Sequence, residues 1–282
     1  MKRILASFII LAVLLSFAAC GKQESAEQDG TLNIQNALIY QDNGVKITSE
    51  GFTEEGDPAI SLNIENSGEA GVEVSFSECV INGYMSEYIL YSGEEVLFGS
   101  IGVPAGESVK AQMVFEKAAL TRCGIEQIGD ISLCVALTNP ETYEDIAYSE
   151  TVHLCVEDGV EQVYDDAGTV AYDKGGIKIV FKGFDPADKS KKTVLVYVAN
   201  ASETGIDISA EKVKVNGKKG QVQYTADVLP GMRSVAVMRF EDALKEIRSL
   251  ETGFCINRYD YKTGEIRDVI AHSKVQSFEL SK

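Results

Sequence analysis

The chain repeats itself, and this duplication constrains the fold more than any other feature. The stretch IYQDNGVKI at residues 39–47 aligns with AYDKGGIKI at residues 171–179. Further along, Asn82-Gly83 recurs as Asn216-Gly217, and AQMVFEKA recurs as AVMRFEDA. Because the matches keep the same order in both halves, the sequence is a tandem duplication of one structural unit.

Within each unit, apolar and polar residues alternate. Ile60, Leu62 and Ile64, for example, are separated by single polar residues. Alternation with a period of two is typical of strands that have one buried and one exposed face. An Asn-Gly pair between apolar runs favours a tight hairpin turn, because both positions tolerate positive φ. With six or seven short strands per unit, the sequence predicts an all-β protein of two tandem immunoglobulin-like β-sandwich domains.

A helical pattern interrupts the strands in the second unit. Phe240, Ala243, Leu244, Ile247 and Leu250 have the spacing of one face of a helix. The matching stretch of the first unit, residues 115–129, is less regular and predicts two helical turns that end near Gly124. We expect each sandwich to have a short helix that crosses between its two sheets.

Composition places the boundary between the units. Residues 156–169, VEDGVEQVYDDAGT, are acidic and contain two glycines, and their apolar residues are too widely spaced for a core strand. We therefore expect the first sandwich at residues 32–158, a linker at 159–168 and the second sandwich at 169–282.

The N-terminus has the three parts of a secretory signal. Lys2 and Arg3 precede an apolar run of sixteen residues, which is shorter than the roughly 20 residues of a membrane span. Ala18-Ala19 before Cys20 resembles the lipobox of bacterial lipoproteins, although Phe17 stands where that family usually has an aliphatic residue. The resemblance implies a signal peptide at residues 1–19, cleavage before Cys20, lipidation of its thiol and a flexible tether at residues 20–31. An ordinary signal peptide and an uncleaved anchor are the alternatives.

Charge and motifs narrow the functional classes. The formal net charge is −17, and it becomes −19 when the signal and its two cations are removed. Such acidity argues against nucleic acid as a partner, because binding phosphates requires basic patches. The two histidines, His153 and His272, occupy different places in the two units, and the sequence lacks G-x-S-x-G, H-E-x-x-H and phosphate-binding glycine motifs. We predict a non-enzymatic protein with no catalytic residues, no metal site and no cofactor.

Five cysteines follow Cys20, so at least one cannot pair within the chain. Buried free cysteines pack as small hydrophobic residues. If residues 131–137 and 151–156 form a hairpin centred near Glu144, Cys134 lies opposite Cys155, at a distance suitable for a disulfide. The second unit has Glu279 where Cys155 aligns, so the fold does not require this bond.

The first unit has about eight more residues than the second between the Asn-Gly turn and the next Pro-Gly signal. This insertion is rich in aromatic residues, and tyrosine and methionine are enriched at binding surfaces. We therefore consider an exposed binding edge, with packing against the protein's own sheets as the alternative. The candidate binding residues are Tyr84, Tyr88, Tyr91 and Phe98.

With the lipobox, the YDxxGIKI-like opening and the VxVNG hairpin, the mature chain resembles uncharacterised lipoproteins of Gram-positive anaerobic bacteria with tandem immunoglobulin-like repeats. The resemblance implies an extracytoplasmic protein that a lipid anchors to the cell membrane. The predicted function is a surface binding module with an envelope protein or a glycan as partner. Because the chain has no tryptophan, a protein partner is favoured over a sugar. The alternatives are a structural spacer or an envelope-assembly component without a small ligand and, less favoured, a hydrolase.

Overall fold

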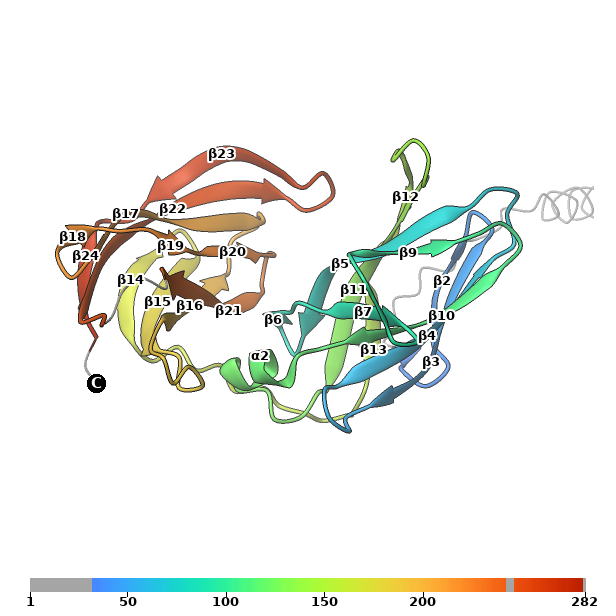
Figure 1. Ribbon diagram of the computed structural model, residues 1–282, viewed down its shortest axis with the longest axis horizontal. Helices are drawn as coiled ribbons and strands as arrows, with labels where there is room; N and C mark the ends of the chain where they lie inside the picture. The colour runs from blue at the N-terminus through green and yellow to red at the C-terminus, as the bar shows by residue number, and fades with distance from the viewer. Residues whose placement is uncertain (1–31, 242–245, 281–282) are drawn as a thin grey trace, which may run out of the picture. The chain divides into compact units, whose positions relative to one another are not determined.

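The computed structural model describes residues 32–241 and 246–280 (Figure 1). The regular structure of this part of the chain is almost entirely β-strand, as the alternating pattern predicts, and the predicted all-β class is confirmed. The expected signal peptide, Cys20 and the tether at residues 20–31 lie outside the described residues. Among the residues that are described, no helix has the length and apolar character needed to cross a membrane.

The first unit forms two layers with a shared core. One layer is a six-stranded sheet in the order β2-β3-β4-β10-β7-β8. Its strands are β2 (Leu38–Asp42), β3 (Val45–Thr53), β4 (Ala59–Asn66), β10 (Ser108–Val114), β7 (Ile89–Ser92) and β8 (Glu95–Leu97). The facing layer contains β1 (Leu32–Asn33), β13 (Val152–Cys155), β11 (Asp130–Thr138), β12 (Asp145–Tyr148), β5 (Val72–Ile81), β9 (Ser100–Val103) and β6 (Tyr84–Met85).

The second unit repeats this arrangement around a second cluster of buried apolar residues. One layer contains β14 (Thr169–Lys174), β15 (Ile177–Phe184), β16 (Thr193–Asn200), β21 (Arg233–Phe240) and β19 (Val222–Gln223). The other contains β18 (Lys218–Lys219), β17 (Ile206–Val215), β22 (Ser249–Asp260), β23 (Glu265–His272), β20 (Thr225–Val228) and β24 (Gln276–Glu279).

Equivalent asparagines make equivalent hydrogen bonds in the two units, as expected for two copies of one structural unit. The buried Asn66 amide donates to the carbonyl oxygens of Ala70 and Val103. Its counterpart Asn200 donates to those of Thr204 and Val228. The same amide side chain therefore satisfies the same backbone acceptors of a buried turn in both copies.

The two Asn-Gly turns are also as predicted. Asn82 and Gly83 have φ values of 48° and 78°, and Asn216 and Gly217 have 51° and 74°. These values suit the tight turns that close β5–β6 and β17–β18. Each asparagine also secures the segment that leads into the central strand of its layer. Asn82 Oδ1 accepts from the N–H of Gly129, and Asn216 Oδ1 accepts from that of Arg248, each at 2.8 Å.

The predicted crossover helix exists in the first unit. Helix α2 (Lys117–Arg122) follows β10 in one layer and precedes β11 in the other. Gly124, with φ of 68°, follows the C-cap residue Cys123, so the helix ends near Gly124 as expected. The prediction of a helix over residues 240–250 is wrong, because Phe240 ends β21 and Leu250 lies in β22. Ala243 and Leu244 of the same pattern lie outside the described residues.

The two units share one sheet. Strand β6 of the first unit pairs in parallel with β21 of the second at Tyr84 and Arg233, and the Arg233 N–H donates to the Gly83 carbonyl oxygen at 3.0 Å. The Arg233 guanidinium lies 3.6 Å from the ring centroid of Tyr164, which itself packs on the Tyr84 ring. The expected linker at residues 159–168 therefore packs on both units through Tyr164.

An ion pair also joins the units. Arg122, at the end of α2, donates through Nε to the buried carboxylate of Asp185 at 2.8 Å. Residues 31–282 form one compact unit by their contacts, so the domain boundary at 159–168 stays a prediction.

Candidate interaction surface on an edge hairpin

The insertion in the first unit forms a hairpin at the edge of a sheet. Strand β7 pairs with β10, and β8 pairs only with β7, so β8 is the last strand of the six-stranded sheet. Gly93, with φ of 60°, lies in the turn between them. An edge strand leaves backbone donors and acceptors unpaired on its outer side, which makes it a natural place for another chain to bind.

The two faces of this hairpin differ. Leu90 is buried in the core and Leu97 packs against it. The alternate residues Ile89 and Val96 point away from the core and are 45% and 42% exposed. Tyr91, which lies opposite Val96, is on the same outward face and is half-buried. The outer face of the hairpin is therefore apolar.

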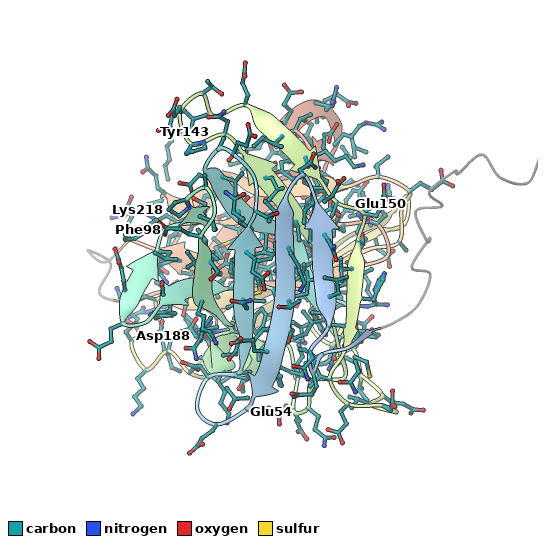
Figure 2. The ribbon with its side chains drawn as sticks, turned by 90° about the vertical axis from the view of Figure 1, so that its right-hand side faces the viewer. Glu54, Phe98, Tyr143, Glu150, Asp188 and Lys218 are labelled. Atoms are coloured by element: carbon teal, nitrogen blue, oxygen red, sulfur yellow. The ribbon has the colours of Figure 1, made fainter. Side chains whose placement is uncertain are left out.

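Phe98 is the most exposed large apolar residue in the part of the chain that the structure describes. It directly follows β8 (Figure 2). Of its surface, 95% is accessible to solvent. Its phenyl ring contributes nothing to the core, and exposing it costs free energy because apolar surface remains in water. An aromatic ring of this kind, beside Ile89 and Val96, is typical of an interaction surface rather than of scattered surface hydrophobicity.

Two of the four predicted binding residues do not face solvent. Tyr84 is buried where the two units meet, packed on Tyr164. Tyr88 donates its hydroxyl to the Phe76 carbonyl oxygen and its ring packs edge-on against that of Phe76. Burial raises the pKa of the Tyr88 phenol to about 12. These two tyrosines pack against the protein's own sheets, which leaves Tyr91 and Phe98 on the surface.

Sequence reasoning missed Ile89 and Val96. A tyrosine count cannot say which face of a strand a side chain occupies, whereas alternation with Leu90 as the buried reference would have found both. The signal was therefore present in the sequence, in the period of the pattern rather than in its composition.

The predicted disulfide is not formed in the structure. Cys155 lies opposite Asp130, and its thiol donates to Asp158 at 3.1 Å. The Cys134 sulfur lies 3.6 Å from the Thr151 hydroxyl instead. All five cysteines after Cys20 are free, namely Cys79, Cys123, Cys134, Cys155 and Cys255.

The reason for this error is a shift of register. Ala136 lies opposite Tyr148, so the hairpin turns earlier than Glu144, and the returning strand is interrupted between β12 and β13. Cys134 and Cys155 therefore occupy different levels of the sheet. Burial raises the pKa of the Cys134 thiol to about 11, so this thiol is protonated at neutral pH.

No cluster of three or more His, Cys, Asp or Glu side chains suited to a metal ion occurs within residues 32–241 and 246–280. His153 is exposed on β13, and Nδ1 of His272 lies 3.1 Å from a carboxylate oxygen of Glu211. The two histidines are thus on different units, as the sequence indicated.

Neither a scan of protein-family models nor a search of curated proteins gives a match to this chain. Solved structures are similar to it only loosely. The YadV chaperone has 12% identity and a TM-score of 0.26, with 84% of this chain and 100% of that chain covered. The Salmonella enterica SafA pilin in complex with the SafB chaperone has 11% identity and a TM-score of 0.28, with 84% and 98% covered.

A conserved domain protein from Bacillus anthracis has 13% identity and a TM-score of 0.28, with 95% of this chain and 98% of that chain covered. At such low values the likeness carries no argument about function, so the interaction surface is considered on its own geometry.

Proposed function

We propose that this chain is a lipid-anchored, extracytoplasmic, non-enzymatic module that binds a protein partner through the outer face and free edge of the β7–β8 hairpin. The observation that carries the proposal is Phe98, an aromatic side chain that is 95% exposed on a segment the second unit does not have. The anchor in this proposal is Cys20, on the basis of its resemblance to a lipobox.

The fold of the second unit supports a binding role for the hairpin. That unit builds two layers and a buried core without a counterpart of β8. Strand β19 keeps only the beginning of β7, since Gln223 pairs with Arg239 as Ile89 pairs with Val114. The sandwich can therefore form without the outer strand, and its exposed apolar face needs another explanation than folding.

A protein partner fits this surface better than a glycan. Sugar-binding platforms commonly present flat aromatic rings together with polar groups, and the chain contains no tryptophan. The hairpin instead offers aliphatic side chains, one protruding ring and an unpaired strand edge. Such an edge can add a strand from a partner through backbone hydrogen bonds.

Site-specific photo-crosslinking tests the proposal. A benzophenone side chain replaces Phe98 in the full-length protein expressed in its own membrane, and illumination should attach it to a defined protein. The matched control carries the same group at Tyr143, which is 82% exposed on the loop between β11 and β12. The proposal is wrong if position 98 captures no protein, or captures only what position 143 captures.

A further inference from the structure

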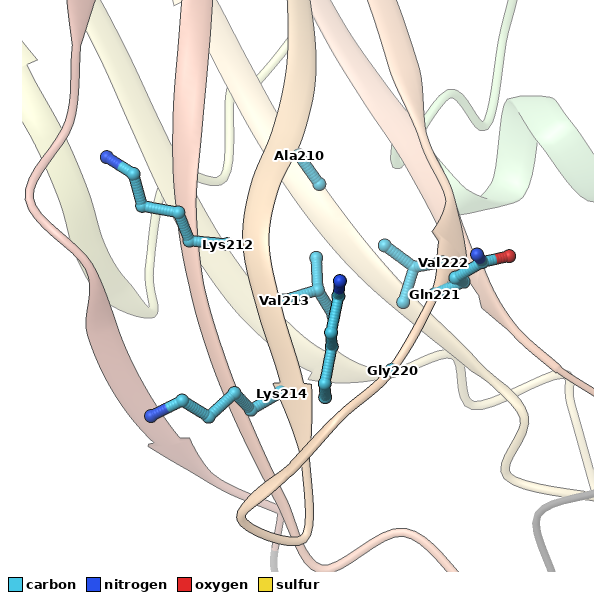
Figure 3. Close-up of a pocket in the computed structure, with 8 residues that line it drawn as sticks. Ala210, Lys212, Val213, Lys214, Gly220, Gln221 and Val222 are labelled. Atoms are coloured by element: carbon cyan, nitrogen blue, oxygen red, sulfur yellow. The ribbon is translucent and has the colours of Figure 1, made fainter.

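A pocket opens on the second unit beside its Asn-Gly hairpin. It has a volume of about 550 Å³. Ala210 and Val213 of β17 lie on one side and Val222 of β19 on the other (Figure 3). Val213 and Val222 also pack against the core of the second unit. The floor of the pocket is therefore apolar and continuous with that core.

The first unit fills the equivalent space with two aromatic rings. With Asn82 aligned to Asn216, Ala210 stands where the first unit has Phe76, and Val222 stands where it has Tyr88. The Phe76 and Tyr88 rings lie 6.3 Å apart, edge to face, over the core of the first unit. The pocket thus exists because the second copy has small residues at the two positions where the first copy has rings.

The backbone next to the two sites is alike at two places, although the strand that follows is longer in the first unit. Glu78 and its counterpart Lys212 have φ values of 51° and 54° at matching irregularities of β5 and β17. Ser86 N–H donates to the Cys79 carbonyl oxygen, as Gly220 N–H donates to that of Val213. The second copy therefore has these backbone features of the site but lacks the two aromatic rings.

Positive charge surrounds this pocket in an otherwise acidic protein. Lys212, Lys214, Lys218 and Lys219 lie within eight residues, and all four are exposed. Lys212 and Lys214 extend from the side of β17 that faces away from Val222 (Figure 3). Lys212 pairs with Glu211, and Lys214 pairs with Glu251. Among the described residues, Lys218 and Lys219 make no ion pair, although Lys219 lines the pocket.

The β7–β8 hairpin has the opposite character. Phe98 protrudes from it, and the segment from residue 86 to residue 99 carries Glu87, Glu94 and Glu95 with no cation. One surface therefore presents an exposed aromatic ring beside carboxylates. The other presents a pocket without its rings beside ammonium groups.

We infer that the protein partner of the hairpin is a second copy of this chain, with Phe98 of one copy inserted between Ala210, Val213 and Val222 of the next. The inference rests on the proposed function, since it names the partner of the same hairpin. Glu94 and Glu95 of the first copy then lie near Lys218 and Lys219 of the second. Burial of the ring supplies the attraction, and the charges supply orientation.

The overall charge favours this orientation. Without the signal segment each copy has a net charge of −19, so two copies repel one another over most of their surfaces. The lysine-rich hairpin at residues 212–219 is where an acidic segment is attracted instead. Because the ring and the pocket are different surfaces of the chain, one copy can offer its ring to one neighbour and its pocket to another, which builds rings or open chains. Two copies that exchange both contacts form a closed two-fold dimer instead.

Two variants remove the two halves of the contact separately. Phe98→Ser removes the ring. The double substitution Ala210→Phe and Val222→Tyr fills the pocket with the residues that the first unit has at these positions. Tyr143→Ser is the matched control, because it removes an exposed ring from another loop. Circular dichroism and thermal melting establish that each variant is folded.

Sedimentation velocity of the chain from residue 21 measures the association. Wild-type protein and the Tyr143→Ser control should form larger species as concentration rises. For each contact variant alone, the affinity of self-association should be weakened by about tenfold or more. It should therefore remain monomeric at concentrations where the wild type associates. A mixture of the two should form heterodimers and nothing larger, because one partner supplies Phe98 and the other supplies the open pocket.

The results separate this inference from the proposed function. The inference is overturned if the wild-type chain is monomeric at all concentrations, if the mixture stays monomeric, or if the contact variants associate like the wild type. In membranes, benzophenone at position 98 should attach to residues of the pocket in another copy. Capture of a different protein there would overturn the inference and leave the proposed function standing, whereas capture of none would remove both.

Discussion

Two carboxylates face each other across strands of the second unit, and they provide a test of the electrostatics. Asp227 on β20 lies directly opposite Asp207 on β17. Asp207 is buried and accepts a hydrogen bond from the Asn257 amide at 2.7 Å. Like charges directly opposed on paired strands are destabilising. Burial, and next the negative charge of Asp207, raise the pKa of Asp227 from its ordinary value of 3.8 to about 6.

The direction of the pH effect follows from this pKa. The folded protein holds a proton on Asp227 up to about pH 6, whereas the unfolded chain releases it near pH 4, so the folded state binds more protons between these values. The unfavourable contribution is absent below pH 4, grows as the pH rises from 4 to 6, and is complete above pH 6. Stability contributed by this group is therefore lost as the pH rises.

The size of the effect is set by the shift and by solvent. A shift of about two pH units corresponds to at most about 3 kcal/mol. Although neighbouring atoms partly desolvate its carboxylate, Asp227 is exposed at the surface of β20, so solvent screens the repulsion and about 1 kcal/mol is the realistic value. For a chain of this size, that corresponds to a change in melting temperature of about 2–4 °C.

The substitution Asp227→Asn removes the charge and keeps a side chain that can donate to Asp207. It should raise the free energy of unfolding by about 1 kcal/mol at pH 7.5 and leave it nearly unchanged at pH 4. Urea unfolding at a series of pH values measures both, with Glu54→Gln in the exposed loop after β3 as the control. The carboxylates do not repel one another if the variant is less stable than wild type at neutral pH. The same conclusion follows if the free energy of unfolding of the variant falls between pH 4 and 6 as much as that of wild type.

The remaining predictions concern the anchor and the contacts between the units. Cys20→Ser should release the protein from membranes or leave it as an unprocessed precursor, which fractionation and mass spectrometry detect; fully cleaved and still membrane-bound protein would refute the anchor. Gly83→Ala should lower the melting temperature, because a Cβ there would lie 2.6 Å from the Tyr164 hydroxyl in a backbone of positive φ; Gly56→Ala, where the Cβ meets open space at a similar φ, isolates the effect of contact. Arg122→Ala should destabilise by about 3 kcal/mol or more, since it leaves buried Asp185 without its cation, and Arg122→Lys should restore part of the loss.

Much of the fold could be predicted because it is encoded in local patterns. The alternation around Ile60, Leu62 and Ile64 places a strand, and the Asn-Gly pairs place two turns whose φ values only a few residue types accept. The duplication makes these predictions more secure, since a pattern that occurs in both copies is less often due to chance. These features depend on residues close in sequence, which is why they can be read without coordinates.

The errors arose where the answer depends on contacts between distant segments. Phe240 and Leu250 have helical spacing because both lie in the core, yet each belongs to a different strand. Cys134 and Cys155 were paired on the assumption of a hairpin centred near Glu144, whereas the strands turn about two residues earlier and Cys155 lies opposite Asp130. The position of Tyr84 depends on β21 of the other unit, and no local pattern carries that information.

The same strand has an open edge in both copies, and the way each edge is covered explains the differences between them. Strand β10 is covered along Gln112–Val114 by β7, which the insertion lengthens and backs with β8. Strand β21 receives only two residues of β19 near Phe240, and the backbone of Gly83 from the first unit at Arg233. The neighbouring unit thus covers part of the β21 edge, and the second unit has no hairpin of its own at this edge.

The second unit also lacks the aromatic pair that the first unit has beside this strand. Tyr88 begins the segment that leads into β7, and its ring is held over Phe76 by the hydrogen bond to the Phe76 carbonyl oxygen. Where the strand is shortened to β19, Val222 takes the place of Tyr88 and Ala210 that of Phe76. The exposed ring of Phe98 and the pocket without rings are therefore two differences between the copies around the same edge strand. A contact between them would place an aromatic side chain in the site where the second copy has none of its own.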